Sequence, residues 1–508
     1  MFSKINSVGI TGLDAYMVDV EADAKRRAEM PQFNIVGLPD TAVKEARDRV
    51  RAAIKNCNFR LPPSKLIVNL APADTKKEGA LYDLPMLIAV LRAHDILKED
   101  YSDSAFLGEL SLDGTVREVK GVLPMAICAK EHNIKHLFVP KGNALECSII
   151  DGLTVYPVNH ALDVVAHLTG KNPISPIPPL DFSKINLGDE LDFADVKGQH
   201  LAKKAMEIAA AGGHNVLLIG PPGSGKSMLS KRLPSILPEL SFKEALETTK
   251  IYSIAGLLDE KTPIINKRPF RSPHHSITSQ GLAGGGAVPK PGEISLSHNG
   301  VLFLDELPEF SRKTMETLRQ PLEDGTITLS RAATSLTYPC SITLIAAMNP
   351  CPCGYFGHPT KPCMCSDKAV YKYLGRISGP LLDRLDLHVE VPAVDYSELA
   401  NKAQSESSKS IRERVLKARL IQQKRFEGTD ITSNARITPK LLHTFCPLTA
   451  EAELILKDAF EALSMSGRAY DRILKVARTI ADLDGKEVID ETHIAEALQF
   501  RALDRKYF

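Results

Sequence analysis

The chain has 508 residues, a formal net charge of +1 and hydrophobic residues at 44% of its positions. At roughly 100–200 residues per domain, this length predicts three or four domains. The near-neutral charge excludes a strongly basic or acidic protein, so composition neither demands nor rules out a polyanionic partner. There is no run of about 18 apolar residues, and the first residues lack the apolar segment of a secretory signal. We therefore expect a cytoplasmic protein without membrane spans.

The first 168 residues alternate strand and helix signals. Residues 33–39 are typical of a strand that ends in a turn, and residues 66–70 of a second strand. Apolar residues at helical spacing predict an amphipathic helix over 41–56, and residues 84–93 are typical of a buried helix. This mixture predicts a separate α/β or α+β domain over residues 1–168.

The rest of the chain divides by composition. Four prolines between Pro173 and Pro179 mark residues 169–190 as a linker, because proline fixes φ and removes a backbone donor. Strand–turn–helix signals fill residues 191–396, and residues 397–508 are charged and helical. We therefore expect an α/β core followed by a helical C-terminal part.

A glycine-rich segment, GPPGSGKS, lies between a strand predicted at 215–219 and a helix predicted at 228–233. The pattern GxxxxGK[ST] in this context is typical of a loop that binds nucleotide phosphates. Its backbone N–H groups and the helix N-terminus attract the phosphates. We expect Lys226 to reach the β- and γ-phosphates of ATP and Ser227 to bind Mg²⁺. The predicted nucleotide-binding residues are Gly220, Pro221, Pro222, Gly223, Ser224, Gly225, Lys226, Ser227 and Asp305.

Two further predicted strands end in residues that suit ATP hydrolysis. The apolar run at 301–304 is followed by Asp305, which we expect to face Mg²⁺. Its neighbour Glu306 is expected to orient and deprotonate the attacking water. A strand predicted at 341–347 leads to Asn349, which we expect to hold the water or the γ-phosphate. The alternative is that Asn349 only serves the turn before Pro350.

Several segments together resemble the magnesium-chelatase-like AAA+ ATPases, with the closest likeness to the YifB/ComM family. They are GPPGSGKS, RPFRSPHHSIT, GVLFLDEL, SLTYPCSITLIAAMNPCPCG and GPLLDRLDLHVEV, and in the N-terminal part NIVGLPDTAVKEARDRVRAAI and NLAPADTKKEGALYDLP. The resemblance covers essentially the whole chain. It implies a multidomain α/β fold with an α+β Lon-protease-like domain (1–168), a P-loop AAA+ α/β core (191–396) and a C-terminal α-helical lid (397–508).

The resemblance also implies a function. The better-studied branch of the family implies an ATP-driven homo-hexamer that acts on DNA, a translocase or helicase that promotes branch migration during recombination or natural transformation. The alternative is a chelatase-like ATPase that remodels a protein partner without nucleic acid.

The same resemblance implies roles for arginines. Arg384 in LLDRLD resembles the arginine finger that reaches the γ-phosphate of a neighbouring subunit, and Arg376 is the second candidate. Arg468 lies where related motors place the sensor 2 arginine, with Arg472 one helical turn further on. A permanent planar positive charge suits these roles, because negative charge develops in the transition state.

The Lon-like resemblance raises the possibility of proteolysis, which the residues oppose. Lon-type peptidases need a nucleophilic serine and a lysine that activates it. There is no serine between Ser64 and Ser102, and Leu123 or a neighbour occupies the place of the lysine. We therefore expect a non-catalytic N-terminal domain that acts as a scaffold or docks a protein partner.

Five of the nine cysteines lie between Cys340 and Cys365. In a chain without an export signal, such a cluster favours a metal site over disulfides. Two CxC pairs suit tetrahedral Zn²⁺ in a loop over residues 351–365. His358 is an alternative ligand, and four reduced cysteines without metal are the other interpretation. The four predicted zinc ligands are Cys351, Cys353, Cys363 and Cys365.

An insert at about 251–298 carries basic residues and a glycine-rich run, and residues 328–333 are typical of a hairpin. In related ring helicases, inserts at these places grip the phosphate backbone of DNA, a grip that must be electrostatic and independent of sequence. The alternative is that the insert is structural or contacts neighbouring subunits. Its candidate residues are Arg268, Arg271, His274, His275 and Lys290, and in the hairpin Arg331.

Overall fold

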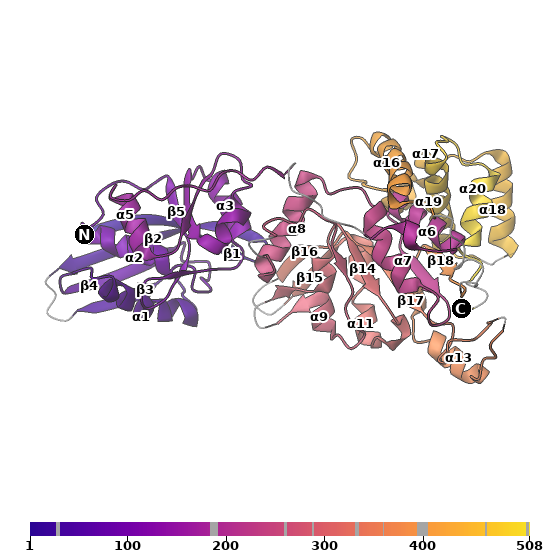
Figure 1. Cartoon of the computed structure of the whole chain (residues 1–508), viewed down its shortest axis with the longest axis horizontal. Coiled ribbons are helices and arrows are strands. Elements are labelled where there is room, and N and C mark those ends of the chain that lie inside the picture. Colours follow the sequence, from indigo (N-terminus) through magenta and orange to yellow (C-terminus); the bar gives the residue numbers. More distant parts are fainter. Residues whose placement is uncertain are drawn as a thin grey trace. The chain divides into compact units, whose positions relative to one another are not determined.

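The computed structural model describes residues 1–26, 31–182, 191–258, 262–286, 289–330, 335–358, 360–393, 405–462, 465–503 and 507. The chain forms two compact units, each with its own hydrophobic core (Figure 1). The N-terminal unit comprises Met1–Asn186 and Phe242–Asn266, and the C-terminal unit comprises Leu187–Ser241 and Lys267–Phe508. Within the described ranges, the helices are too short or too polar to cross a membrane.

A seven-stranded mixed sheet with the strand order β3-β4-β2-β1-β5-β8-β9 forms the N-terminal unit. Strand β2 pairs antiparallel with β1 and β4, whereas the other neighbours in the sheet run parallel. The edge strand β3 and its neighbour β4 confirm the two strands predicted in this region. The strands are β1 (Phe2–Thr11), β2 (Asp14–Arg26), β3 (Gln32–Val36), β4 (Ser64–Ala71), β5 (Ser104–Phe106), β8 (His136–Pro140) and β9 (Thr154–Val158), with a small hairpin of β6 (Glu109–Leu110) and β7 (Val116–Arg117).

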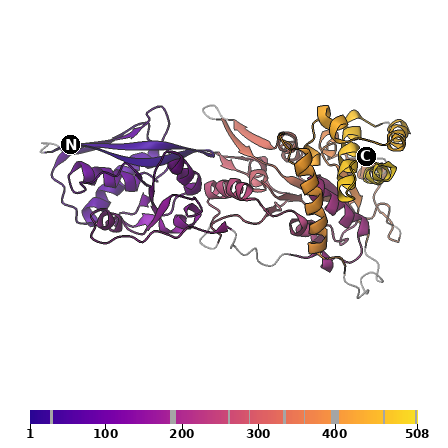
Figure 2. The same ribbon diagram turned by 90° about the horizontal axis from the view of Figure 1, so that it is seen from above.

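The helices of this unit gather on one face of its sheet (Figure 2). They are α1 (Thr41–Asn56), α2 (Asp83–Ala93), α3 (Val122–Glu131), α4 (Lys141–Cys147), α5 (Ala161–Leu168) and α8 (Phe242–Ala255). The first two confirm predicted helices. The sequence did not predict that helix α8 belongs to this unit, because its segment lies between the P-loop and Asp305 in the chain. It packs on α3, where the backbone N–H of Gly121 donates to the carbonyl of Ser253 at 3.0 Å.

Five parallel strands with the order β11-β14-β17-β10-β18 form the sheet of the C-terminal unit. The strands β10, β14 and β17 confirm three predicted strands. Their carboxyl ends meet at one edge of the sheet, because all five strands run parallel. The bounds are β10 (Val216–Ile219), β11 (Phe270–Arg271), β14 (Val301–Leu304), β17 (Thr343–Met348) and β18 (Leu387–Glu390).

Short elements surround this sheet. The strands β15 (Thr326–Ser330) and β16 (Ser335–Pro339) form the predicted hairpin, although Arg331 itself lies outside the described residues. A second short pair, β12 (Gly284–Gly285) and β13 (Lys290–Pro291), lies in the insert. The helices are α6 (His200–Gly212), α7 (Lys226–Arg232), α9 (Ser279–Ala283), α10 (Glu293–Leu296), α11 (Arg312–Glu316), α12 (Arg319–Asp324), α13 (Asp367–Leu374) and α14 (Gly379–Leu382).

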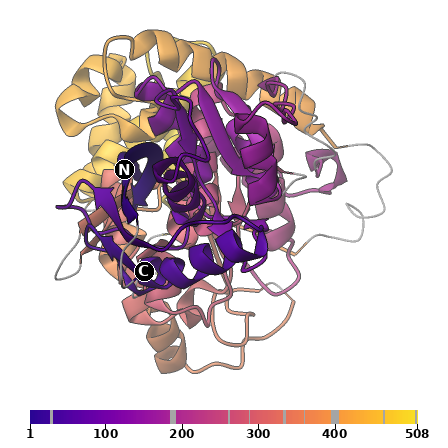
Figure 3. The same ribbon diagram turned by 90° about the vertical axis from the view of Figure 1, so that its left-hand side faces the viewer.

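The last helices gather on one side of the C-terminal unit and confirm the predicted helical region (Figures 1 and 3). They share one hydrophobic cluster with the sheet, because Val415, Leu456 and Ile473 belong to the same core as Val216. The predicted boundary at 396/397 lies outside the described residues and stays a prediction. The helices are α16 (Ser408–Arg425), α17 (Leu442–Phe445), α18 (Ala450–Ala462), α19 (Gly467–Leu483) and α20 (Glu491–Gln499).

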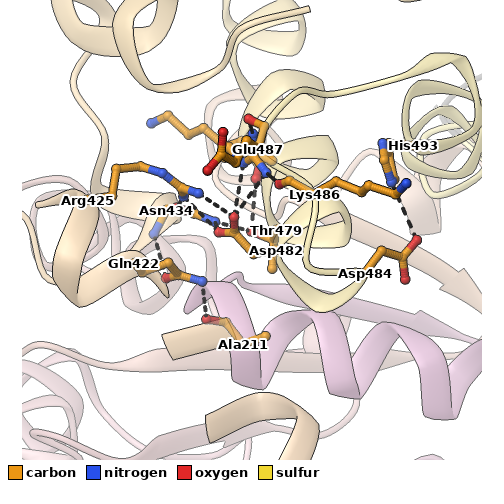
Figure 4. Close-up of polar contacts among 12 residues, drawn as sticks. Ala211, Gln422, Arg425, Asn434, Thr479, Asp482, Asp484, Lys486, Glu487 and His493 are labelled. Atoms are coloured by element: carbon orange, nitrogen blue, oxygen red, sulfur yellow. Dashed lines mark hydrogen bonds and ion pairs between the residues drawn. The ribbon is translucent and has the colours of Figure 1, made fainter. Parts of the chain in front are cut away.

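A buried polar network fixes α19 to its neighbours (Figure 4). The carboxylate of Asp482 is 1% exposed and accepts hydrogen bonds from Arg425 at 2.8 Å, Asn434 at 2.7 Å and Arg478 at 3.1 Å. Gln422 on α16 donates to the carbonyl of Ala211 on α6 at 3.0 Å. Since a buried charge is stable only when it is paired, the contacts of Asp482 hold α19 against α16.

Candidate nucleotide-binding site

The phosphate-binding loop connects the buried strand β10 with α7. Gly223 and Gly225 have φ of +78° and +92°, a left-handed conformation that favours glycine. A Cβ at Gly220 would lie 2.1 Å from the carbonyl oxygen of Val391, so that position also requires glycine. Because α7 begins at Lys226, its first N–H groups have no acceptor within the helix and are available to an anion.

Lys226 and Asn349 come together at this loop, as predicted from their positions after β10 and β17. The ammonium of Lys226 donates to the carbonyls of Gly220 at 2.7 Å and Pro221 at 2.9 Å, and lies 3.4 Å from Oδ1 of Asn349. Burial lowers the pKa of Lys226, while the charge of Asp305 opposes this shift. A phosphate would give this buried cation the strong anionic partner that the carbonyls do not provide.

The two predicted magnesium ligands are in direct contact. The hydroxyl of Ser227 donates to Oδ2 of Asp305 at 2.7 Å, although the two residues are 78 positions apart in the chain. Hydroxyl and carboxylate oxygens are the ligands that Mg²⁺ binds in phosphate-handling sites. The residues therefore fit a magnesium ion held between the P-loop and the end of β14.

Glu306 lies beside a histidine that the sequence did not connect with it. Its carboxylate oxygen Oε2 is 3.1 Å from Nδ1 of His275. The backbone of Glu306 is left-handed, with φ of 53°. Strand β11 pairs in parallel with β14, so residues that follow the two strands meet at the same edge of the sheet. That pairing is what brings His275 to Glu306, and the sequence contained no signal for it.

Gln199 is a second residue that sequence reasoning missed. Its Nε2 donates to the carbonyls of Ser224 at 3.2 Å and Pro392 at 2.7 Å, so it joins the P-loop to the segment after β18. The side chain is 8% exposed, and its Oε1 has no hydrogen-bond partner within the described part of the chain. Gln199 therefore leaves a buried acceptor next to the loop that binds phosphates.

Arg384 lies at the other edge of the sheet. The carbonyl of Arg384 accepts a hydrogen bond at 2.9 Å from Asn215, the residue that precedes β10, whereas Lys226 follows that strand. The guanidinium of Arg384 donates to the carbonyl of Pro380 at 2.6 Å and pairs with Glu323. The structure therefore does not bring Arg384 to the P-loop of its own chain.

Arg468 and Arg472 on α19 lie at the same edge as Arg384. Arg468 is 62% exposed and lies 3.9 Å from Asp383, whereas Arg472 is 12% exposed and lies 3.6 Å from Asp386. Burial raises the pKa of Asp386, but the hydrogen bond from His214 and the charges of His214 and Arg472 outweigh it and lower the pKa to about 2.

Arg376, the other candidate for the finger, forms an ion pair of 2.8 Å with Glu309 and also contacts the carbonyl of Pro308.

The basic residues of the insert serve the protein itself in two cases. Arg268 donates to the carbonyls of Pro238 at 2.5 Å and Asn299 at 2.8 Å. Arg271 forms two hydrogen bonds of 2.7 Å with the carboxylate of Glu293. Arg268 thus holds the insert against segments outside it, and Arg271 links two parts of the insert, as in the structural alternative for this segment.

The four cysteines predicted to bind zinc come together. Their sulfur atoms all lie within 4.8 Å of one another, and three of the distances are 3.3, 3.5 and 3.6 Å. Four thiolates around Zn²⁺ at about 2.3 Å would have sulfur–sulfur distances of about 3.8 Å, so the arrangement fits a tetrahedral ion. The backbone N–H of Phe356 lies 3.3 Å from the sulfur of Cys351, the kind of hydrogen bond that supports a metal-bound thiolate.

The cysteine loop also contacts the P-loop. A Cβ placed on Gly354, which has φ of +82°, would lie 2.5 Å from the ring of Pro222. The loop between the two CxC pairs therefore packs directly against the phosphate-binding segment. The sequence placed the cluster near Asn349 but contained no indication of this contact.

Comparison with known proteins agrees with this arrangement. The chain matches three family descriptions: subunit ChlI of magnesium chelatase over residues 192–399, the ChlI subunit of Mg-chelatase over 20–143, and the ChlI C-terminal region over 405–501.

Two relatives match over almost their whole length. The chain is 44% identical to competence protein ComM of Haemophilus influenzae over 502 residues, 97% of this chain and 96% of the relative. It is 43% identical to the protein YifB of Escherichia coli over 506 residues, 99% of this chain and 97% of the relative. A shorter match, 29% identical over 150 residues, covers 28% of this chain and 26% of Lon protease 2 of Bacillus subtilis. The chain therefore belongs to the YifB/ComM family of magnesium-chelatase-like AAA+ ATPases.

Proposed function

We propose that the protein is an ATP-hydrolysing DNA motor that works as a homo-hexamer, a translocase or helicase that promotes branch migration in recombination or natural transformation. The observation that carries the ATPase part is the meeting of Lys226, Ser227, Asp305, Glu306 and Asn349 at one edge of a parallel sheet. The name of the Haemophilus relative refers to competence, and 44% identity over nearly the whole chain supports carrying a DNA-directed role over.

The chemistry follows from the positions of the side chains. Lys226 binds the β- and γ-phosphate oxygens, and Ser227 and Asp305 are the residues that would hold Mg²⁺. Bound Mg²⁺ would neutralise charge on the phosphates of ATP. Glu306 orients the attacking water and takes its proton, and Asn349 holds the water or the γ-phosphate. In the free protein, His275 holds the carboxylate of Glu306 by a 3.1 Å contact.

The ring is supported by the positions of the arginines. Arg384 and Arg468 lie at the edge of the sheet opposite to Lys226, so neither contacts the phosphate site of its own chain. Head-to-tail contacts between identical subunits join two different surfaces and can close into a ring. The proposed ring joins this edge of one subunit to the P-loop edge of the next. We infer that both arginines act on the nucleotide of the neighbouring subunit.

A second candidate function is the remodelling of a protein partner without DNA. It is favoured by the hydrogen bonds of Arg268 and Arg271 to the protein itself, because they occupy guanidinium donors that could otherwise contact DNA phosphates. The N-terminal part, proposed as a non-catalytic Lon-protease-like domain over residues 1–168, would then dock that partner. Residues 169–190, 191–396 and 397–508 remain our proposed linker, ATPase core and lid.

DNA should stimulate ATP hydrolysis severalfold if the protein is a DNA motor, because gripping DNA would favour the ring geometry in which the arginines meet the nucleotide. The measurement is the steady-state ATPase rate with single-stranded, duplex and forked DNA, at two salt concentrations. Glu306→Gln serves as the inactive control. Equal rates with every DNA form would reject the DNA motor and leave the protein-remodelling ATPase.

We propose further that Cys351, Cys353, Cys363 and Cys365 bind one Zn²⁺ that orders the loop over residues 351–365. Purified protein should carry about one zinc per chain, since structural Zn²⁺ contributes on the order of 10–16 kcal/mol to such a module. Replacing Cys353 and Cys363 together by serine should remove the zinc and make the loop sensitive to protease. Hydrolysis should fall, because the loop packs on Pro222.

The matched control for the zinc prediction is Met364→Ala, since this side chain lies between two of the cysteines and is 91% exposed. It should keep the zinc and the ATPase rate. Elemental analysis and limited proteolysis give the two readouts. The wild-type protein must be purified without chelators for this test. A zinc content far below one equivalent per chain would contradict the assignment.

A further inference from the structure

A cavity of about 590 Å³ lies in the N-terminal unit, where nothing described above places a function. It is lined by the beginnings of β3 and β4, the last turn of α1, the connection that follows α1 and the end of α2. Small-molecule sites in proteins have volumes of roughly 300–1,000 Å³. The cavity is therefore large enough for a ligand of about the size of a nucleotide.

The charge around this cavity is one-sided. Arg51, Lys55 and Arg60 line it and are exposed, and no carboxylate is among its lining residues in the described part of the chain. None of the three cations forms an ion pair or a side-chain hydrogen bond with another described residue. By contrast, Arg47 on the same helix is bonded to Asp48 at 3.0 Å. Besides the hydrogen bond from Arg47, the nearby charge of Arg51 also helps to lower the pKa of the Asp48 carboxyl. Three positive charges in a concave wall that no carboxylate of the described chain lines still attract an anion.

The remaining wall is apolar and aromatic. Phe33 is 9% exposed and Leu66 5% exposed, and both belong to the core of the unit, against which Phe59 packs. Phe33, Phe59 and Leu66 all line the cavity. An aromatic wall beside cations is the combination that binds nucleotides, because the base lies against the rings and the phosphate meets the charges.

One polar corner completes the cavity. Nδ1 of His94 lies 2.9 Å from the carbonyl of Val90, which can only accept, so this nitrogen carries the hydrogen. In the neutral ring Nε2 is then an acceptor, and it takes a hydrogen bond from the hydroxyl of Ser64 at 3.2 Å. The two side chains hold each other in the wall and offer fixed polar atoms that a base or a sugar can meet.

We propose that this cavity binds one nucleoside phosphate, with the phosphate on Arg51, Lys55 and Arg60 and the base against Phe59 and the apolar wall. Arginine suits this ligand, because its planar fork matches phosphate oxygens. A nucleoside phosphate can reach the cavity as a free mononucleotide or as one nucleotide of a single DNA strand. The proposal concerns a site in the N-terminal unit and does not depend on the motor's action on DNA.

The test uses two photoreactive probes on the full-length protein, with the P-loop saturated by ADP and Mg²⁺. One is 5-iododeoxyuridine monophosphate, and the other is an oligothymidine with a single 5-iododeoxyuridine. We expect a crosslink to Phe33 or Phe59, located by mass spectrometry of the peptides. Arg51→Glu together with Lys55→Glu should lower the crosslink yield at least about tenfold, since two charges that attract the phosphate would be replaced by two that repel it.

The control is Lys44→Glu together with Arg47→Glu, which reverses two charges on the same helix outside the cavity. It should lower the yield far less than the cavity variant does, because neither side chain lines the cavity and Arg47 is already bonded to Asp48. A crosslink with the mononucleotide identifies a free nucleotide as the ligand, and a crosslink with the oligonucleotide alone identifies a DNA strand. Absence of both crosslinks from Phe33 and Phe59, or a yield that charge reversal does not change, would overturn the proposal.

The same variants separate this site from the motor. DNA-stimulated ATP hydrolysis without a crosslink in the cavity would leave the DNA motor standing and remove the nucleotide site. A crosslink without DNA stimulation would do the reverse. Arg51 and Lys55 are exposed, so equal thermal unfolding temperatures of the variants and the wild type would show that a lost crosslink reflects binding and not folding.

Discussion

Replacing Glu306 by glutamine is expected to stop ATP hydrolysis and to leave ATP binding intact. Glutamine has nearly the same shape, and its amide oxygen can still contact His275, but it cannot take a proton from water. A positioned general base contributes a factor of about 10²–10⁴ to a rate, so we expect hydrolysis to fall at least that far. Binding should persist, because the phosphates are held by Lys226 and the backbone of the P-loop.

The matched comparison is Lys226→Ala, which should weaken ATP binding itself. The ammonium of Lys226 is buried at the phosphate-binding loop. Removing it therefore removes a direct contact between the protein and the phosphates of ATP. Equilibrium binding of a fluorescent ATP analogue and the ATPase rate are measured on both variants. A Glu306→Gln protein that hydrolyses ATP at the wild-type rate would show that another group acts as the base.

Much of the local structure was predictable, because the responsible signals lie close together in the sequence. Helix α1 spans Thr41–Asn56 as predicted, and Asp40 caps it by accepting a hydrogen bond from the backbone of Val43 at 2.7 Å. The strands β10 and β14 are continuous apolar runs, the pattern of a strand buried on both faces of a parallel sheet. Since parallel strands end at one edge, the meeting of Lys226, Asp305 and Asn349 followed from the sequence.

The contacts that were not predicted depend on which distant segments fold together. Helix α8 interrupts the ATPase region in sequence but belongs to the N-terminal unit, since its partner surface on α3 lies more than a hundred residues away in the chain. His275 reaches Glu306 only through the pairing of β11 with β14. The sequence also does not show which group a basic residue contacts. Arg271, a candidate for contact with DNA, binds the carboxylate of Glu293 in the same chain.

Replacing Arg384 by alanine is expected to reduce ATP hydrolysis by a factor of about 10³ or more, the range observed when an arginine finger is removed. In the single chain this arginine is 10% exposed and paired with Glu323, and its hydrogen bond lowers the pKa of that carboxyl. The guanidinium must therefore leave Glu323 when a neighbouring subunit brings a γ-phosphate. ATP binding should change little, because Arg384 lies at the opposite edge of the sheet from Lys226.

Mixing the two inactive proteins tests whether Arg384 acts between subunits. An interface is active when its base comes from an Arg384→Ala subunit and its finger from a Glu306→Gln subunit. Random mixing in equal amounts gives about one such interface in four in a ring of identical subunits. We expect about that fraction of wild-type ATPase activity, in mixed rings verified by differently tagged subunits. No recovery in verified rings would rule out Arg384, and the same mixture made with Arg376→Ala would then decide whether Arg376, paired with Glu309 in the single chain, is the finger.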